Sequence, residues 1–537
     1  MKRIFIHIIF LIIVATTFAQ NIPVRDPFFI RDIEKSSLLN DTIKHSSIKP
    51  YYFSDVKNIC ADSLQYDKGF LYYSWKSKPG KKPSSFYALP VYEVFNWFDL
   101  SKNILYGLNI HLIGLFDYSI GDKFGVSYQL TGWLLQNTPD YMFAKKYYQW
   151  IYNGLGNSFR DRGELIIEND IRISYTPYSF LRLELANSKN SYGDGYRSFL
   201  LSDFASNYPY FKLETNFLSL KYSCVWAVHN SYLFEMDTIY GGGYFNNYNK
   251  FNVFHYLDWK IGKRLNLGVF ESVITGNNNF FTFEYLNPII FFRPVEFSLG
   301  SEDNALMGAN VKFTINDRNA LYGQFIIDDI IVGQLINDIK HTLNPDYVGQ
   351  YGWFANKWAA QVGMKSYDIF KIKNLDIFTE FNIARPYTYS HVRPEQNYSH
   401  KWQPLAHPLG ANFIESVSGL SYLGKRILFD AKIMYAFVGA DTTGTHFGQN
   451  IFNPTMDGNQ GYSYIVNSYG NTVLQGVKTN MITARIDFGY ILKENKNLSL
   501  NVGVLFRKIC PEIGETTQQT YLYFGVKSNF VKREMIY

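Results

Sequence analysis

The residues best suited to chemistry lie in polar stretches near the middle of the chain. One of them, Tyr192-Gly-Asp-Gly-Tyr-Arg197, is followed closely by Asp203. Tyrosine rings can stack on sugars, while carboxylate, amide and guanidinium groups form hydrogen bonds with hydroxyls. These residue types predict a polysaccharide-binding site. Its candidate residues are Tyr192, Asp194, Tyr196, Arg197, Asp203, Arg293, Glu296, Asp303, Asn304, Asp328, Asp329, His400 and His407.

The same residues also have structural explanations. Glycines in the Tyr192 stretch permit backbone turns closed to other residues, so a loop folded into the protein interior is an equal alternative. The carboxylates could hold a cation through oxygen ligands, but buried charges need partners, which favours pairs with Arg197 or Arg293. His400 and His407 would need further ligands to bind zinc, so we expect them to cap a loop. The sequence predicts no metal and no cofactor.

No stretch of the chain has the pattern of a hydrolase. A Gly-x-Ser-x-Gly elbow is absent, and no serine or cysteine is paired convincingly with a histidine. Cys60, Cys224 and Cys510 are odd in number and widely scattered, so they imply no disulfide framework. We therefore expect the protein not to be an enzyme.

The elements that must position these residues are recognisable from alternation. Between Arg162 and Pro177, apolar and polar residues take turns, so a strand there would show one face to lipid and the other to water. The pattern recurs about sixteen times over roughly ten residues each, which is typical of a transmembrane β-barrel. The apolar face of this strand carries Leu165, Ile167, Ile171, Ile173 and Tyr175, and the polar face carries Glu164, Glu168, Asp170, Arg172 and Ser174, with Ile166 and Asn169 as exceptions.

The connections between these strands alternate in length, with short polar turns followed by much longer loops, as in outer-membrane barrels. This alternation fails at Asn187–Lys250, where a single strand is visible near Phe211–Val228. A closed single-chain barrel requires an even count, so an extra strand lies either there or in Phe86–Leu100. The predicted fold is all-β, a transmembrane antiparallel barrel of 16–18 strands, with 18 favoured.

The N-terminus and the composition agree with this fold. Residues 1–20 have a basic start, an apolar run and a small residue before the expected cut, which predicts a signal peptide. We assign residues 21–85 to a small periplasmic segment and residues 86–537 to the outer-membrane barrel. Aromatic residues make up 18% of the chain, as expected for girdles at both membrane interfaces. The net charge of +6 is too small to suggest nucleic acid.

Four ordered motifs carry a family resemblance. They are Tyr192–Asp203 with Tyr208–Phe211, Glu284–Pro288 with Arg293–Glu296, Gly300–Asn304 with Asp328-Asp329, and His400 with Pro404–Asn412. Together they resemble the capsule assembly (Wzi) family of outer-membrane proteins, and especially its RemB-type gliding motility relatives in Bacteroidetes. The N-terminal segment matches no feature of that family.

The resemblance implies an eighteen-stranded, largely plugged barrel with periplasmic helices that helps bind exopolysaccharide at the cell surface. It implies outer-membrane lipid, surface polysaccharide and gliding or capsule-export machinery as partners, but supplies no sugar-binding residues. The alternatives are an open diffusion porin and an adhesin that acts through its external loops. A plugged barrel predicts that charged residues converge in the lumen or at its outer mouth, namely Arg197, Asp203, Arg293, Glu296, Asp303, Asp328 and Asp329.

Overall fold

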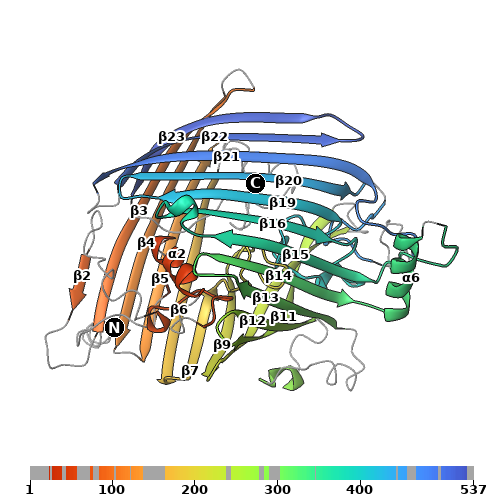
Figure 1. The fold of residues 1–537 in the computed structure, drawn as a ribbon, viewed down its shortest axis with the longest axis horizontal. Helices are drawn as coiled ribbons and strands as arrows, with labels where there is room; N and C mark the ends of the chain where they lie inside the picture. The colour runs from red at the N-terminus through yellow and green to blue at the C-terminus, as the bar shows by residue number, and fades with distance from the viewer. Residues whose placement is uncertain are drawn as a thin grey trace.

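Eighteen antiparallel strands form a closed barrel in the computed structural model (Figure 1). The structure describes residues 23–24, 27–38, 44–56, 73–76, 84–101, 105–120, 123–136, 164–236, 243–276, 283–288, 303–344, 346–442, 445–455, 467–493 and 498–528. None of the helices in these ranges has the length and apolarity needed to span a bilayer. The predicted signal peptide, residues 1–20, lies outside the described residues.

Each wall strand pairs with its neighbours in chain order, and β23 pairs with β3 to close the ring. A short strand, β2 (Tyr73–Lys76), pairs with the first part of β3. The wall strands are β3 (Ser84–Asp99), β4 (Leu105–Ile120), β5 (Phe124–Gln136), β6 (Glu164–Tyr178), β7 (Leu181–Ser188), β9 (Tyr208–Phe217), β10 (Leu220–Met236), β11 (Gly243–Ile261), β12 (Leu265–Thr275), β13 (Asn304–Thr314), β14 (Asn319–Asp329), β15 (Lys357–Ser366), β16 (Leu375–Ala384), β19 (Phe413–Leu423), β20 (Ile427–Ala440), β21 (Val477–Lys493), β22 (Leu498–Pro511) and β23 (Thr517–Ser528).

The predicted fold class is confirmed, and both candidate regions for an extra strand contain one. Strand β3 occupies the upstream region, and β9 and β10 divide the segment that reads as a single strand. The turn between β9 and β10 consists of Leu218 and Ser219, with Leu218 at a φ of 55°. This turn lacks glycine, asparagine and aspartate, the usual signals of a tight hairpin, so the sequence pattern runs through it.

The two faces of the wall follow the alternation in the sequence. On β6, Ile167 and Ile171 are exposed on the outer surface, whereas Arg172 is only 6% exposed and faces the interior. Arg172 donates hydrogen bonds to Tyr210 Oη (2.8 Å) and Glu184 Oε1 (3.3 Å). The predicted faces are therefore confirmed between Ile167 and Tyr175, while the side chains of Glu164 and Leu165 lie outside the described ones.

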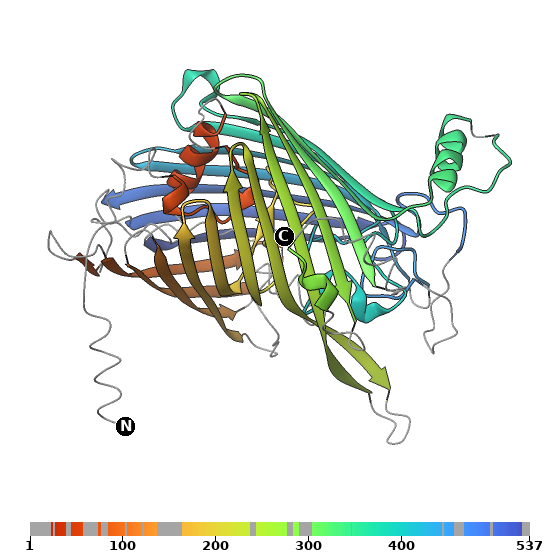
Figure 2. The ribbon, with the colours of Figure 1, turned by 90° about the horizontal axis from the view of Figure 1, so that it is seen from below.

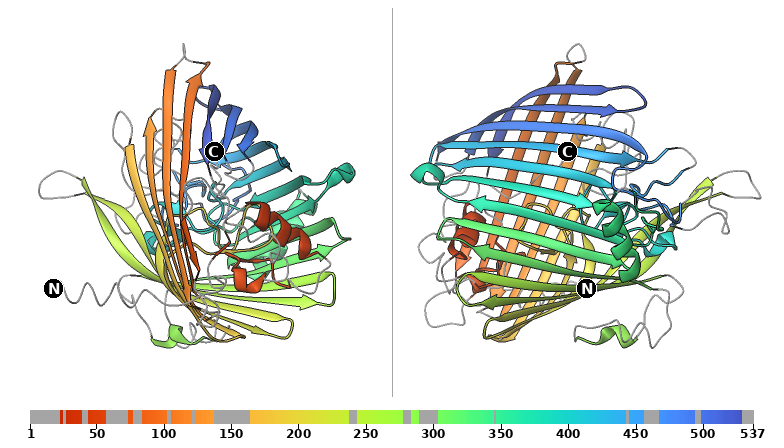
Figure 3. Two further views of the ribbon diagram at one scale, coloured as in Figure 1. Left: turned by 90° about the vertical axis from the view of Figure 1, so that its left-hand side faces the viewer. Right: turned by 45° about the vertical axis from the view of Figure 1, so that its right-hand side comes forward.

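The described part of the N-terminal segment enters the barrel. It comprises α2 (Pro27–Ser36), β1 (Ile48–Lys49) and the short helix η1 (Phe53–Asp55). Helix α2 lies at the end of the barrel formed by the short turns (Figure 3, left). Residues 44–56 lie against inward-facing side chains of the wall: Tyr52 Oη donates to Glu184, and Arg182 pairs with Asp55 at 2.6 Å.

Loops from the opposite end also fold inward. The β7–β9 loop carries β8 (Ser191–Tyr192), which pairs with β1. The β16–β19 loop carries η6 (Pro394–Gln396), β17 (Ser399–His400) and β18 (Gln403–Pro404). Apolar residues of both loops, including Leu200 and Leu405, form one buried cluster with wall residues such as Phe254 and Ile326. Much of the lumen is therefore a packed core.

Candidate functional site

The segments that fold into the lumen, residues 44–56 and the β7–β9 and β16–β19 loops, together form a plug. The Tyr192 motif is part of this plug. Tyr192 is fully buried, its ring stacks on Tyr256 at 4.7 Å, and its hydroxyl lies 2.9 Å from Ser223 Oγ. Gly193 has a φ of +124°, and a Cβ there would collide with Gln324. The glycine thus serves the folding of this loop into the interior, which was the structural alternative for this motif. In this position the Tyr192 ring is not accessible to a sugar.

Asp194 joins the loop to the N-terminal segment. Its carboxylate accepts hydrogen bonds from Ser46 Oγ (2.6 Å) and Asn310 Nδ2 (3.0 Å) and lies 3.4 Å from Lys312 Nζ. Burial alone would raise the pKa of Asp194, but the charge of Lys312 and these hydrogen bonds hold it below its ordinary value. Asp194 is therefore ionised at neutral pH and fixes two inward-folded segments to the wall.

Arg197 lies in a buried cluster with two carboxylates that the sequence did not single out. Arg197 Nη2 lies 3.5 Å from Glu415 Oε1, and the other oxygen of Glu415 lies 2.8 Å from His407 Nε2. Glu380 accepts the backbone N–H groups of Tyr196 (2.8 Å) and Arg197 (3.2 Å). Glu380 on β16 and Glu415 on β19 face inward, in strands whose polar and apolar residues alternate. That alternation is the signal that could have identified them.

Arg197, Asp303 and Asp328 are all buried, and each contacts residues outside the predicted set. Their convergence into one network stays a prediction. Asp328 pairs with Lys357 (3.7 Å) and accepts the Tyr389 N–H (2.7 Å). Asp303 accepts from Tyr285 Oη (2.9 Å), and Asn304 donates to the backbone oxygen of Gln396 (2.9 Å). The β14–β15 ladder has a register shift between Ile327 and Asp329, and Asp329 is the ladder partner of Lys357, so it lies next to the Asp328–Lys357 pair. Arg293 and Glu296 lie outside the described residues.

The two histidines act as loop caps. His400 Nδ1 accepts the backbone N–H of Asn230 (3.1 Å), and its Nε2 lies 3.2 Å from the Asn207 oxygen. Burial and the nearby charge of Lys401 place the pKa of His400 far below its ordinary value, so the ring is neutral. His407 Nδ1 accepts the N–H of Leu409 (3.2 Å). No group of three or more metal-ligating side chains occurs within the described ranges.

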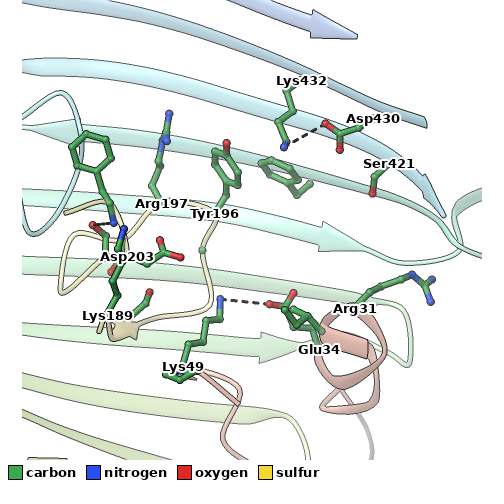
Figure 4. Close-up of a pocket in the computed structure, with 18 of the residues that line it drawn as sticks. Arg31, Glu34, Lys49, Lys189, Tyr196, Arg197, Asp203, Ser421, Asp430 and Lys432 are labelled. Atoms are coloured by element: carbon green, nitrogen blue, oxygen red, sulfur yellow. Dashed lines mark hydrogen bonds and ion pairs between the residues drawn. The ribbon is translucent and has the colours of Figure 1, made fainter. Parts of the chain in front are cut away.

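A cavity of about 760 Å³ remains between the plug and the wall. Three of the candidate residues line it: Tyr196, Arg197 and the exposed Asp203 (Figure 4). The Tyr196 ring stacks on Phe378 at 4.9 Å, and Lys432 Nζ lies 5.5 Å from its centre. The cavity therefore combines an aromatic platform with charged donors and acceptors at one place.

The wall next to Lys432 repeats this combination with residues that were not predicted from the sequence, because Arg485 on β21 is the cross-strand partner of Lys432. Trp97 packs on Tyr523 with ring centres 4.2 Å apart, and Arg485 lies over the same tyrosine at 5.2 Å. Arg485 Nε also donates to Asp487 at 2.7 Å. Strands β3, β21 and β23 bring these residues together across the closing seam, and no local spacing in the sequence reports that contact.

Comparison with known proteins comes from structure alone, since no family model and no curated protein matches the chain. The solved structure of Wzi, described as an outer-membrane protein involved in group 1 capsule assembly in Escherichia coli and as a carbohydrate-binding β-barrel, is similar. The alignment covers 95% of this chain and 100% of Wzi, with a TM-score of 0.57 and 11% identity. The shared feature is the fold.

Two further outer-membrane structures align over most of their length. OccAB2 from Acinetobacter baumannii aligns over 83% of this chain and 97% of its own, at 9% identity and a TM-score of 0.42. OprD from Pseudomonas aeruginosa aligns over 86% and 94%, at 9% identity and a TM-score of 0.38. At these TM-scores the two structures carry no argument about this chain.

Proposed function

We propose that this protein resides in the outer membrane and binds surface exopolysaccharide, helping to assemble or retain a capsule or slime layer. The observation that carries the proposal is the cavity between plug and wall, which Tyr196, Lys432 and Asp203 all line, with Lys432 over the Tyr196 ring. Rings that stack on sugar faces, with charged groups for hydroxyls or uronic acids, suit a glycan. The likeness of the fold to Wzi, a carbohydrate-binding barrel, supports it.

The proposal includes a non-catalytic role, without metal or cofactor and without nucleic acid as a partner. Its partners are outer-membrane lipid, the glycan, and either capsule-export or gliding machinery. A RemB-type role in gliding is a variant of the same attachment function, in which the retained glycan is slime. An open porin and an adhesin that acts through external loops are the competing functions. The packed plug, with Leu200 and Leu405 fully buried in the lumen, disfavours an open porin.

The direct test is binding of purified exopolysaccharide to the full-length protein in detergent. Tyr196→Ala removes the ring that faces the cavity, and we expect about fivefold weaker binding, the equivalent of about 1 kcal/mol for a lost ring contact. Lys432→Ala tests the neighbouring cation.

The matched control is Tyr435→Ala, because Tyr435 lies on the same strand as Lys432 but is exposed on the outer face. We expect this variant to bind as the wild type does. Unchanged binding by Tyr196→Ala and Lys432→Ala, with a wild type that binds, would place the glycan on the external loops. A wild type that binds no exopolysaccharide would refute the proposed function.

A further inference from the structure

Helix α6 (Val332–Leu343), in the loop between β14 and β15, has an unusual surface. Four apolar residues recur at helical spacing and form a stripe along one side. They are well exposed: Val332 by 66%, Ile336 by 47%, Ile339 by 51% and Leu343 by 81%. Within the described residues, nothing covers this stripe, and the helix contains no buried residue.

The polar side of α6 is the one held against the protein. Asp338 accepts the Gly352 N–H (2.6 Å) and pairs with Arg385 (3.2 Å). The His341 ring stacks on Tyr351 with centres 3.4 Å apart, and Tyr347 Oη donates to Asn337 (2.9 Å). A helix on a water-soluble surface has the opposite orientation, with its apolar side toward the protein. The anchoring of α6 therefore directs the stripe outward.

The position of α6 indicates which environment its apolar stripe faces. Ile327, on the outer face of β14, is paired with Trp358, whose ring contacts the exposed Phe325. Tryptophan at the end of an apolar band marks the lipid–water interface of such barrels. The helix begins at Val332, five residues after Ile327, and stands clear of the wall on the side away from the interior (Figures 1 and 2).

We propose that α6 is an interfacial helix whose apolar stripe inserts into the lipid leaflet around the loop end of the barrel. The stripe continues the apolar band of the wall, because Phe325, Ile327 and the exposed Ile331 lead directly into it. We expect lipid to cover the stripe, because the stripe and the apolar band of the wall face the same environment. An amphipathic helix of this kind buries its apolar side at the boundary between headgroups and acyl chains. This inference does not depend on glycan binding.

The test uses fluorescent labels on single introduced cysteines in the full-length protein, reconstituted in phospholipid vesicles. Ile339→Cys places the label in the stripe, and Thr342→Cys places it on an exposed flank of the same helix. Both are made in a Cys60→Ser, Cys510→Ser background, with buried Cys224 retained. Nitroxide groups on the lipid acyl chains should quench the label at 339 at least threefold more than the label at 342. Equally weak quenching at both positions would overturn the proposal.

A second measurement separates lipid from a second copy of the chain. Ile339→Asp changes an exposed residue, so the barrel should fold normally, as checked by its thermal transition. We expect the wild type and Ile339→Asp to have the same oligomeric state in detergent, while Ile339→Asp loses the protection of α6 from protease that vesicles give the wild type. A wild-type dimer that Ile339→Asp dissociates would show that protein, and not lipid, covers the stripe.

Discussion

At the scale of single residues, neighbouring side chains in a strand of this barrel lie in different environments, one on the outer surface and the next in the interior. Ile171 is exposed on the outside of β6, and its neighbour Arg172 is buried among hydrogen-bonding partners inside. The effect of a charged substitution on the stability of the barrel should therefore depend on which face of the strand carries it.

Arginine at position 171 should therefore be costly. Ile171→Arg places a charge toward lipid and should destabilise the folded barrel by about 2–4 kcal/mol if it lies near mid-membrane. Asn501→Arg is the control, because Asn501 lines the cavity and the new charge would meet water. Urea titrations of folding into vesicles measure both. Equal losses of stability would show that the faces are assigned wrongly.

The buried Arg197–Glu415 pair should hold the β7–β9 loop in the lumen. Glu415→Ala leaves the guanidinium of Arg197 without this carboxylate, a change that costs about 3–5 kcal/mol in buried pairs. We expect faster hydrogen exchange throughout residues 188–208. Arg318→Ala, which removes an exposed pair with Asp317 (3.8 Å), should leave the exchange unchanged. Slow exchange in both variants would mean that apolar packing alone holds the loop.

At the scale of elements, α2 is held by ion pairs to the β15–β16 turn and to the first residues of β16. Arg31 pairs with Asp376 (2.5 Å) and Asp368 (2.6 Å), and Lys35 with Asp368 (2.5 Å). Burial alone would raise the pKa of Asp368, but the hydrogen bond from Lys35, the Asn374 N–H and the charge of Arg31 lower it to about 2.

This anchoring gives α2 a predictable response to acid. A carboxylate with a depressed pKa stabilises the docked helix above its ordinary value of 3.8, and this contribution is lost as the pH falls through about 2. A dye on Asp32→Cys, on the exposed side of α2, should show constant anisotropy down to about pH 4 and a decrease toward pH 2. In Arg31→Ala the anisotropy should be low at every pH. A release near pH 6 would implicate a different group.

The strands of the wall could be predicted from the sequence, whereas the segments that fill the lumen could not. Alternation along each strand is a local signal, so the strands, their faces and an even count could be predicted. The prediction missed the β9–β10 turn at Leu218, because this turn has none of the glycine, asparagine or aspartate residues that usually mark a tight hairpin. The position of residues 44–56 inside the barrel depends on contacts such as Ser46 with Asp194, which are 148 residues apart, and no local pattern records them. Tyr196, Arg197 and Asp203 were predicted from their residue types, whereas Glu380 and Glu415 were missed although they occupy inward positions of β16 and β19.

At the scale of the whole molecule, the lumen is occupied from both ends. The N-terminal segment enters from the short turns and the long loops enter from the other side, and they meet where β1 pairs with β8. Ions must then pass between plug and wall, so planar bilayer recordings should give low conductance for the wild type. It should rise in Asp328→Ala, which loses the contacts to Lys357 and Tyr389. A large and steady wild-type conductance would indicate an open porin.

The pairing of β23 with β3 joins the last wall strand in chain order to the first. This ladder runs only from Tyr521–Asp99 to Lys527–Glu93, whereas the ladder between β3 and β4 extends from Ser84–Ile120 to Asp99–Leu105. Residues 44–56 and 188–208, which fill the lumen, precede β23 along the chain. A chain long enough to close the ring therefore already contains the segments that fill it.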